Sequence, residues 1–224
     1  MDRVSLVVFD LAGTTIENSS HVAEAFAETL ARTGVEVAMR DIAAVRGASK
    51  REAIARLIPA GPDHARRSAA GYATFTELLR RAYAEHGVRP IAGAERTMRA
   101  LRARGIRVAL NTGFDRQVAQ PLLDALQWDA ATIDATVFGD DVRAGRPAPF
   151  LIFRAMELTG VFPVHEVVNV GDTTLDLQAG YNAGVKWNVG VLSGAHTGQV
   201  LSQSPHTHLV ESVVDLLPLV CDRS

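Results

Sequence analysis

The heptapeptide FDLAGTT, residues 9–15, brings an apolar segment to an end at a carboxylate. The residues that lead up to it, Val4 to Phe9, form a short run of mainly β-branched and other apolar side chains. Such a run predicts a strand that is buried on both faces of a parallel sheet. Asp10 would then stand at the carboxyl end of the strand, where open α/β sheets bind their ligands.

The remainder of the chain divides into two patterns near residue 89. Before it, helical periodicity predicts helices over residues 21–34, 39–58 and 65–87, and no strand pattern occurs between 16 and 88. After it, strands and helices alternate: we expect strands over 106–110, 135–138, 167–170 and 185–191, and helices over 96–104, 117–126, 149–159 and 210–220. This order predicts a doubly wound, Rossmann-like α/β parallel sheet at 1–15 and 89–224, with an inserted all-helical domain at 16–88.

Composition narrows the classes of function. The 224 residues are 47% hydrophobic and carry a net charge of −2, which gives no electrostatic reason to expect nucleic acid or an anionic membrane as a partner. No apolar stretch approaches the roughly 20 residues that span a bilayer. A single cysteine, Cys221, and the absence of a signal-peptide pattern favour a cytoplasmic location. Only Lys50 and Lys186 are lysines among the 23 basic residues.

Several polar residues follow predicted strands and would meet at one edge of the sheet. Asp10 and Asp172 would repel each other there unless they shared a proton or a cation, and Asp176 could add a third carboxylate. Oxygen ligands with open positions for a substrate phosphate suit Mg²⁺. Thr112, with the backbone N–H of Gly113, supplies donors for an anionic group, and Arg146 in the segment AGRPAP supplies a cation. A carboxylate can attack a phosphoryl group once this charge is neutralised.

Four segments taken together resemble the haloacid dehalogenase (HAD) superfamily: FDLAGTT, LNTGF, GRPAP and GDTTLD match its four motifs in order. The resemblance covers essentially the whole chain. It implies that Asp10 is the nucleophile, forms an aspartyl-phosphate and binds Mg²⁺ together with Asp172, and that Asp176 supports the metal site. It also implies that Thr112 binds the phosphoryl group and that Arg146 holds its charge where a lysine is more usual. The helical insertion would be the cap that closes over the site.

Position 12 sets this chain apart within the superfamily. Most family phosphatases have an aspartate there that protonates the leaving alcohol, but Ala12 can offer only its backbone carbonyl, as a metal ligand. The form DxAGT together with AGRP resembles the phosphonatase branch, which cleaves a P–C bond. In that branch a cap lysine forms a Schiff base with the substrate, so the leaving group departs as an enamine and needs no acid. Lys50 in RGASKREAI stands where the branch has this lysine.

Substrate-binding residues are expected around Lys50 and the second motif. Arg46 would lie four residues before Lys50 on the same helical face and would lower its pKa, and Gly113 and Phe114 would contact substrate. The chain departs from the branch pattern at Arg46 (methionine in the branch), Ala53 (histidine), Phe114 (a hydroxylated aromatic) and Ser20 (cysteine). An ordinary solvated Lys50 therefore stays an alternative, and the exact substrate is left open.

Other functions compete with phosphonate cleavage. The runner-up is a phosphate monoesterase on a small phosphorylated metabolite, similar to phosphoglycolate phosphatases. In a dehalogenase the carboxylate attacks carbon and needs no metal, so the pair Asp172 and Asp176 disfavours this function. A receiver-like phosphoacceptor module is disfavoured by the inserted helices, which such modules lack. In every enzymatic interpretation the partner is a small molecule, and a homodimer is left open.

Overall fold

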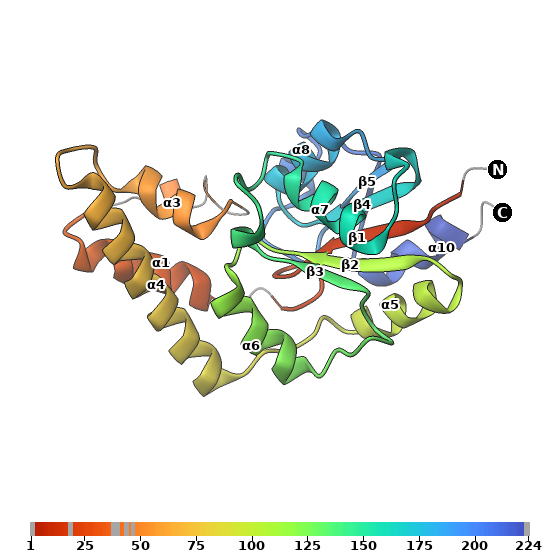
Figure 1. The fold of residues 1–224 in the computed structure, drawn as a ribbon, viewed down its shortest axis with the longest axis horizontal. Helices are drawn as coiled ribbons and strands as arrows, with labels where there is room; N and C mark the ends of the chain where they lie inside the picture. Colours follow the sequence, from red (N-terminus) through yellow and green to blue (C-terminus); the bar gives the residue numbers. More distant parts are fainter. Residues whose placement is uncertain (1–2, 18–19, 37–40, 43–44, 46–47, 222–224) are drawn as a thin grey trace.

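A computed structural model describes residues 3–17, 20–36, 41–42, 45 and 48–221. Its centre is a six-stranded parallel sheet with the order β3-β2-β1-β4-β5-β6 (Figure 1). The strands are β1 (Leu6–Asp10), β2 (Arg107–Asn111), β3 (Ala135–Val137), β4 (Val167–Gly171), β5 (Trp187–Val191) and β6 (His208–Val210). The predicted α/β doubly wound fold is thereby confirmed.

Helices cover both faces of the sheet because each central strand is apolar on both sides. Val7 and Phe9 of β1 belong to the core on the face of α5 (Ala94–Ala103), α6 (Arg116–Leu126) and α10 (Leu216–Cys221). Leu6 and Val8 point to the other face, toward α7 (Phe150–Thr159) and α8 (Thr174–Ala183). Short elements complete this part of the chain: α9 (Gly198–Leu201) and the 3₁₀ turns η1 (Gly139–Asp141), η2 (Val164–Glu166) and η3 (Val213–Asp215).

The order of the strands determines which residues meet at the carboxyl edge. β1 lies between β2 and β4, and Asp10 pairs in register with Asn111. The residues that directly follow β2 and β4 therefore flank Asp10. β2 and β3 lie on one side of β1 and β4, β5 and β6 on the other, so the direction in which strands are added reverses beside β1, which is where doubly wound sheets form a binding crevice.

The segment between β1 and α5 has no strand among its described residues, although isolated β-bridges join Ala12 to Ile16 and Ile16 to Pro90. It contains α1 (His21–Arg32), α3 (Lys50–Leu57) and α4 (His64–His86), which lie together beside the carboxyl edge of the sheet (Figure 1). The rings of Phe26 and Phe75 pack at 4.6 Å between centroids and, with Leu30, Ile54 and Leu79, give these helices a buried apolar centre continuous with the main core. The exact boundaries of an inserted domain at 16 and 88 stay a prediction.

Two parts of the sequence-based secondary structure need correction. The helix predicted over 210–220 begins only at Leu216, because His208–Val210 adds β6 to the sheet edge by pairing with β5, and η3 follows it. The sequence also did not predict α8, whose interior contains Gly180. A Cβ at that position would lie 2.0 Å from Asn188 Oδ1, so the close packing of α8 on β5 requires glycine. Glycine has a low helix propensity, which is why the sequence does not indicate a helix here. Most of the segment 39–47 of the helix predicted over 39–58 lies outside the described residues.

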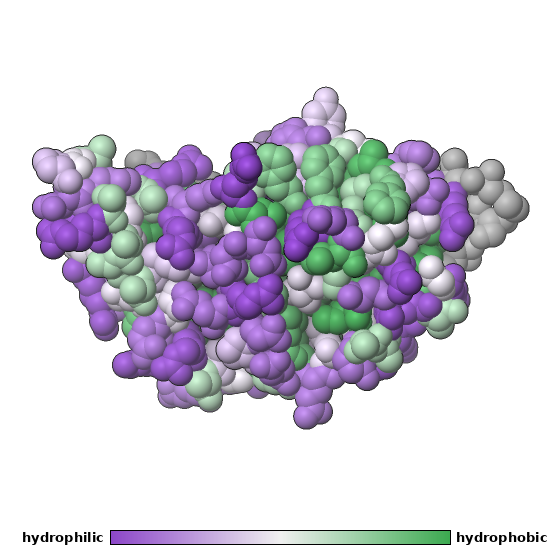
Figure 2. Space-filling model, viewed as in Figure 1, coloured by the Kyte–Doolittle hydropathy of each residue, from purple (hydrophilic) through white to green (hydrophobic). Residues whose placement is uncertain are grey.

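The surface differs between the two parts of the molecule. Figure 2 shows a largely hydrophilic surface over the helical segment, and apolar side chains near α7, where Phe150 and Phe153 are exposed. Among the described residues, no helix has the length and apolar character that crossing a bilayer requires.

Candidate active site

Asp10 is the last residue of β1, and its buried side chain faces the carboxyl edge of the sheet. The turn that follows folds back so that the Thr15 hydroxyl donates to the Asp10 carbonyl oxygen at 3.1 Å. Gly13 in this turn has φ +92°, and a Cβ there would lie 2.3 Å from Asp172 Oδ2. The glycine of FDLAGTT therefore lets the turn pass directly against the second carboxylate.

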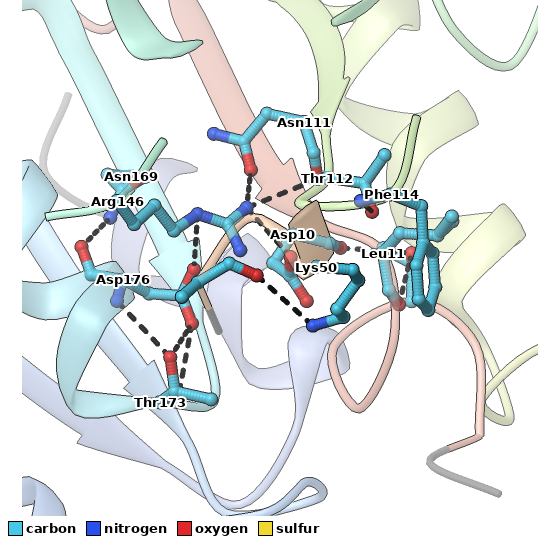
Figure 3. A network of polar contacts seen from close by, with 12 residues as sticks. Asp10, Leu11, Lys50, Asn111, Thr112, Phe114, Arg146, Asn169, Thr173 and Asp176 are labelled. Atoms are coloured by element: carbon cyan, nitrogen blue, oxygen red, sulfur yellow. Dashed lines mark hydrogen bonds and ion pairs between the residues drawn. The ribbon is translucent and has the colours of Figure 1, made fainter. Parts of the chain in front are cut away.

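Arg146 lies at the centre of the site and contacts residues of β1, β2 and α8 (Figure 3). Its Nη2 donates to Asp10 Oδ1 at 2.7 Å, and its Nε to Asp176 Oδ1 at 2.9 Å. The same Nη2 contacts both the backbone oxygen (3.3 Å) and the side-chain oxygen of Asn111. The guanidinium is 4% exposed, so these contacts form in a low-dielectric environment that strengthens charge–charge interactions.

Asp172 follows β4 and is held by backbone rather than by a cation. Its Oδ2 accepts a hydrogen bond from Ala195 N at 2.6 Å, and Gly194 packs so closely that a Cβ there would lie 2.0 Å from Oδ2. Its Oδ1 is buried and has no hydrogen-bond partner among the described residues. Asp176, by contrast, also accepts from the Thr173 backbone N–H at 3.0 Å and from the Thr173 hydroxyl.

Burial and mutual repulsion perturb the carboxyl groups. Burial raises the pKa of Asp10 to about 6; the Arg146 guanidinium opposes this rise and Asp176 adds to it. Burial also raises the pKa of Asp172 well above its ordinary value, and Asp10 and Asp176 raise it further. A cation between Asp10 and Asp172 would relieve this repulsion and bring both pKa values down.

These residues fit a magnesium ion. Among the described residues, no group of three His, Cys, Asp or Glu side chains is arranged to hold a metal. Mg²⁺ needs fewer protein ligands than three, because it commonly keeps several waters and binds one or two carboxylates together with substrate oxygens. The free Oδ1 of Asp172, the Asp10 carboxylate and Ala12 on the same cavity wall provide such a set. The Asp176 oxygens are engaged by Arg146 and Thr173, and its role as a metal ligand stays a prediction.

Lys50 brings an amine from the helical segment into this cluster. It is the first residue of α3, its side chain is 8% exposed, and its backbone N–H donates to Gly113 O at 3.2 Å. Its Nζ donates to Ala48 O at 3.2 Å and lies 5.2 Å from the centroid of the Phe114 ring. Figure 3 shows the amine beside Asp10.

The environment of Lys50 alters its basicity. Burial lowers the pKa of its amine to about 8, against a smaller opposing effect of the Asp10 carboxylate. The sequence suggested Arg46 as the cause of such a shift, but Arg46 lies outside the described residues. Desolvation is the leading cause, and the Arg146 guanidinium contributes to the lowering.

Further contacts join the start of α3 to the sheet domain. Arg51 pairs with the buried Asp115 at 2.9 Å and stacks over the Tyr72 ring of α4 at 4.3 Å. Glu52 accepts a hydrogen bond from Gly145 N at 3.3 Å. These contacts hold the helical segment against the loops after β2 and before α7, and they fix where Lys50 enters the site.

One cavity of about 250 Å³ contains almost the whole predicted set. Its lining includes nine of the ten predicted residues, namely Asp10, Ala12, Lys50, Thr112, Gly113, Phe114, Arg146, Asp172 and Asp176; Arg46 is the tenth. Sequence reasoning missed Asn111, Thr173 and the apolar side chains that α1 contributes. The pattern T-x-x-D at 173–176 is a helix-capping signal that could have identified Thr173.

Comparison with known proteins defines the class. The family model of the haloacid dehalogenase-like hydrolases matches residues 4–184. A phosphonoacetaldehyde hydrolase of Bacillus cereus (strain B4264) is 31% identical over 207 residues, covering 86% of this chain and 77% of the relative. The structure of a phosphonoacetaldehyde hydrolase-like protein from Oleispira antarctica superposes with a TM-score of 0.83 at 25% identity, covering 98% of this chain and 92% of the other. A predicted phosphoglycolate phosphatase from Haemophilus somnus shares the fold, with a TM-score of 0.76 at 20% identity, covering 96% and 97% of the two chains.

The chain belongs to the haloacid dehalogenase-like hydrolases and is therefore an enzyme. Buried carboxylates, an arginine and the Thr112–Gly113 turn at the carboxyl edge of a doubly wound sheet agree with this family. Within it, the chain is phosphonatase-like, in line with its 31% identity to phosphonoacetaldehyde hydrolase over most of both chains.

Proposed function

We propose that this enzyme hydrolyses the P–C bond of a small carbonyl phosphonate through an aspartyl-phosphate on Asp10, assisted by a Schiff base on Lys50. The observation that carries the proposal is a buried lysine with a lowered pKa in the same cavity as Asp10, in a chain with no acid at position 12. The relatives named phosphonoacetaldehyde hydrolase support the same substrate class.

The first step is attack of the Lys50 amine on the substrate carbonyl carbon. A pKa of about 8 leaves about one tenth of the amine neutral at pH 7, far more than an ordinary lysine offers. A C–N bond forms and the carbonyl oxygen leaves as water, which gives a protonated imine. This iminium carbon lies one bond from the carbon attached to phosphorus and withdraws electrons from it.

The second step transfers the phosphoryl group to Asp10. A carboxylate oxygen attacks phosphorus, the P–C bond breaks, and its electron pair forms the C=C bond of an enamine. The enamine is then protonated on carbon and hydrolysed from Lys50, and water cleaves the aspartyl-phosphate to free phosphate. No proton has to reach the leaving group as the P–C bond breaks, so Ala12 suffices where a phosphatase needs an acid.

The other residues bind and orient in this scheme. Thr112 and the Gly113 backbone line the cavity beside Asp10 and would bind the phosphoryl oxygens. Arg146, whose Nη2 lies 2.7 Å from Asp10 Oδ1, would favour the ionised form of the Asp10 carboxylate and fix its orientation. Asp10, Asp172 and the Ala12 carbonyl would hold Mg²⁺, which when bound supplies positive charge against the phosphoryl dianion.

A phosphate monoesterase is the second candidate. The phosphoryl-binding half of the cavity is complete without Lys50, and the fold is shared with a predicted phosphoglycolate phosphatase. In this alternative Lys50 would be only a positive charge near the substrate, and a bound water would have to replace the missing acid.

Reductive trapping separates the two candidates. Borohydride added with phosphonoacetaldehyde should reduce the iminium and attach the two-carbon fragment to Lys50, as peptide mass spectrometry would show. Lys50→Arg keeps the positive charge but should abolish both trapping and phosphate release, because a guanidinium does not form the imine. Lys186→Arg is the matched control and should behave as the wild type. Full phosphonate turnover by Lys50→Arg would exclude the Schiff base and leave the monoesterase as the better hypothesis.

A further inference from the structure

The cavity has a second wall, which the chemistry above does not use. α1 contributes Val22, Ala23 and Phe26, and the same segment adds Ile42 and Ser20, the residue just before α1. Phe26 and Ile42 are each 3% exposed, and Phe26 is held by its contact with Phe75. This wall is mainly apolar, with the Ser20 hydroxyl as an exception, whereas the wall formed by the sheet contains carboxylates, a guanidinium and the Thr112 hydroxyl.

Lys50 and Phe114 line the same cavity as both kinds of side chain: Lys50 comes from the helical segment, as the apolar side chains do, and Phe114 follows β2. The amine is near Asp10, and its cation contacts the Phe114 ring, which is 2% exposed. In a phosphonate R–CO–CH₂–PO₃²⁻, phosphorus must meet Asp10 and the carbonyl carbon must meet the Lys50 amine. The group R then extends beyond the carbonyl and away from phosphorus, into the part of the cavity that α1 and Ile42 line.

The size and polarity of that part restrict R. The whole cavity, about 250 Å³, is slightly below the roughly 300–1,000 Å³ of typical small-molecule sites, so R can contain only a few carbons. A charged R would lose its hydration against Phe26 and Ile42 without gaining a partner from them. An alkyl R would gain roughly fourfold in binding for each methylene that it buries.

We propose that the preferred substrates are 2-oxoalkylphosphonates, ketones with a short alkyl group of one to three carbons on the carbonyl. This inference rests on the proposed P–C cleavage and names its substrate class. In this reaction R–CO–CH₂–PO₃²⁻ and water give the methyl ketone R–CO–CH₃ and HPO₄²⁻. The methyl ketone gains its third hydrogen when the enamine is protonated, and the water oxygen ends on phosphate.

The test compares kcat/KM, measured by phosphate release with Mg²⁺ present, for R as hydrogen, methyl, ethyl, propyl and carboxylate. We expect kcat/KM to rise roughly fourfold for each carbon added to R, until R fills the space in front of α1, and to be lowest when R is carboxylate. Ala23→Val narrows the apolar end and should reduce the propyl-to-hydrogen ratio at least fourfold. Ala27→Val makes the same change at an exposed position of α1 and should leave this ratio unchanged.

The outcomes distinguish this inference from the function on which it rests. If hydrogen is the best R and kcat/KM falls with each added carbon, the inference is wrong, while P–C cleavage of phosphonoacetaldehyde stands. If carboxylate is preferred, an unrecognised cation governs specificity and the inference is equally wrong. If no phosphonate releases phosphate and borohydride traps nothing on Lys50, the proposed function itself fails, and this inference with it.

Discussion

Replacing Lys50 by methionine should make the protein more stable at neutral pH while destroying the proposed chemistry. Burial lowers the pKa of this amine from 10.5 to about 8. A lysine with a lower pKa in the folded state than in the unfolded state binds its proton more weakly when folded. Between pH 8 and 10.5 the unfolded chain therefore holds more protons, and the free energy of unfolding rises with pH across that window.

The size of the effect follows from the shift. A difference of about 2.5 pKa units, at 1.36 kcal/mol per unit, means that the protonated amine destabilises the fold by about 3 kcal/mol below pH 8. This penalty disappears above pH 10.5, where the amine is neutral in both states. The stability advantage of Lys50→Met over wild type should thus shrink by about 3 kcal/mol between pH 7 and pH 11.

Urea denaturation followed by tryptophan fluorescence, in the presence of a chelator, measures this difference at pH 7, 9 and 11. Groups far from the cavity titrate in the same way in both proteins, so the difference between the two free energies of unfolding reports Lys50 together with the carboxyl groups of Asp10, Asp172 and Asp176 that interact with its amine. Lys186→Met reports how much of the change comes from losing any lysine. A difference between wild type and Lys50→Met that stays constant with pH would mean that the Lys50 amine is hydrated, and the argument for an activated nucleophile would fail.

Four further experiments test the rest of the site. Asp10→Asn removes the attacking charge at nearly constant size, so turnover should fall to background on every substrate and acid quench should trap no phosphoenzyme; full activity would contradict the family mechanism. Chelation should abolish activity and Mg²⁺ should restore it, with Asp172→Ala weakening metal binding more than Asp176→Ala in calorimetry, because Asp176 is already occupied by Arg146 and Thr173. Mg²⁺ affinity should also rise with pH up to about 6, because the Asp10 carboxyl must lose its proton before it can bind the ion. The rise should be roughly tenfold per pH unit for each proton displaced, and an affinity that does not change with pH would argue against Asp10 as a ligand. Ala12→Asp should increase hydrolysis of an alkyl phosphate monoester by roughly 10²-fold or more and change phosphonate cleavage little, since it supplies the acid that an alkoxide leaving group needs and an enamine does not.

The sheet was predictable because its strands carry strong local signals. Buried parallel strands are largely apolar runs: β1 and β2 each contain an uninterrupted one, and β4 and β5 are each interrupted by a single asparagine. Polar residues that follow such runs must meet at one edge, whatever the details of packing. β6 has only three residues, all partly exposed, and its existence depends on pairing with β5, which no pattern within residues 208–210 encodes.

The site was predictable in its residues but less so in their partners. Motif spacing placed Asp10, Asp172 and Arg146 together, yet it could not show that Arg146 also contacts Asn111, because that contact depends on the position of β2 beside β1. The burial of Lys50 was equally hidden. The sequence allowed a solvated lysine, and only the packing of α3 against Gly113 and Phe114 removes its amine from water.

These contacts also explain why an arginine suits position 146. The cation there lies 2.7 Å from Asp10, inside the cavity that would bind the carbonyl group of the proposed substrate. A lysine at this point would place a second amine beside Asp10, able to compete with Lys50 for the carbonyl but poorly placed to assist P–C cleavage. A guanidinium keeps its proton and does not form an imine, and its charge contributes to the lowered pKa of Lys50. Among the described lining residues Lys50 is then the single amine, so the proposed Schiff base would form at one place only, and Arg146 would hold Asp10 and Asp176 in position.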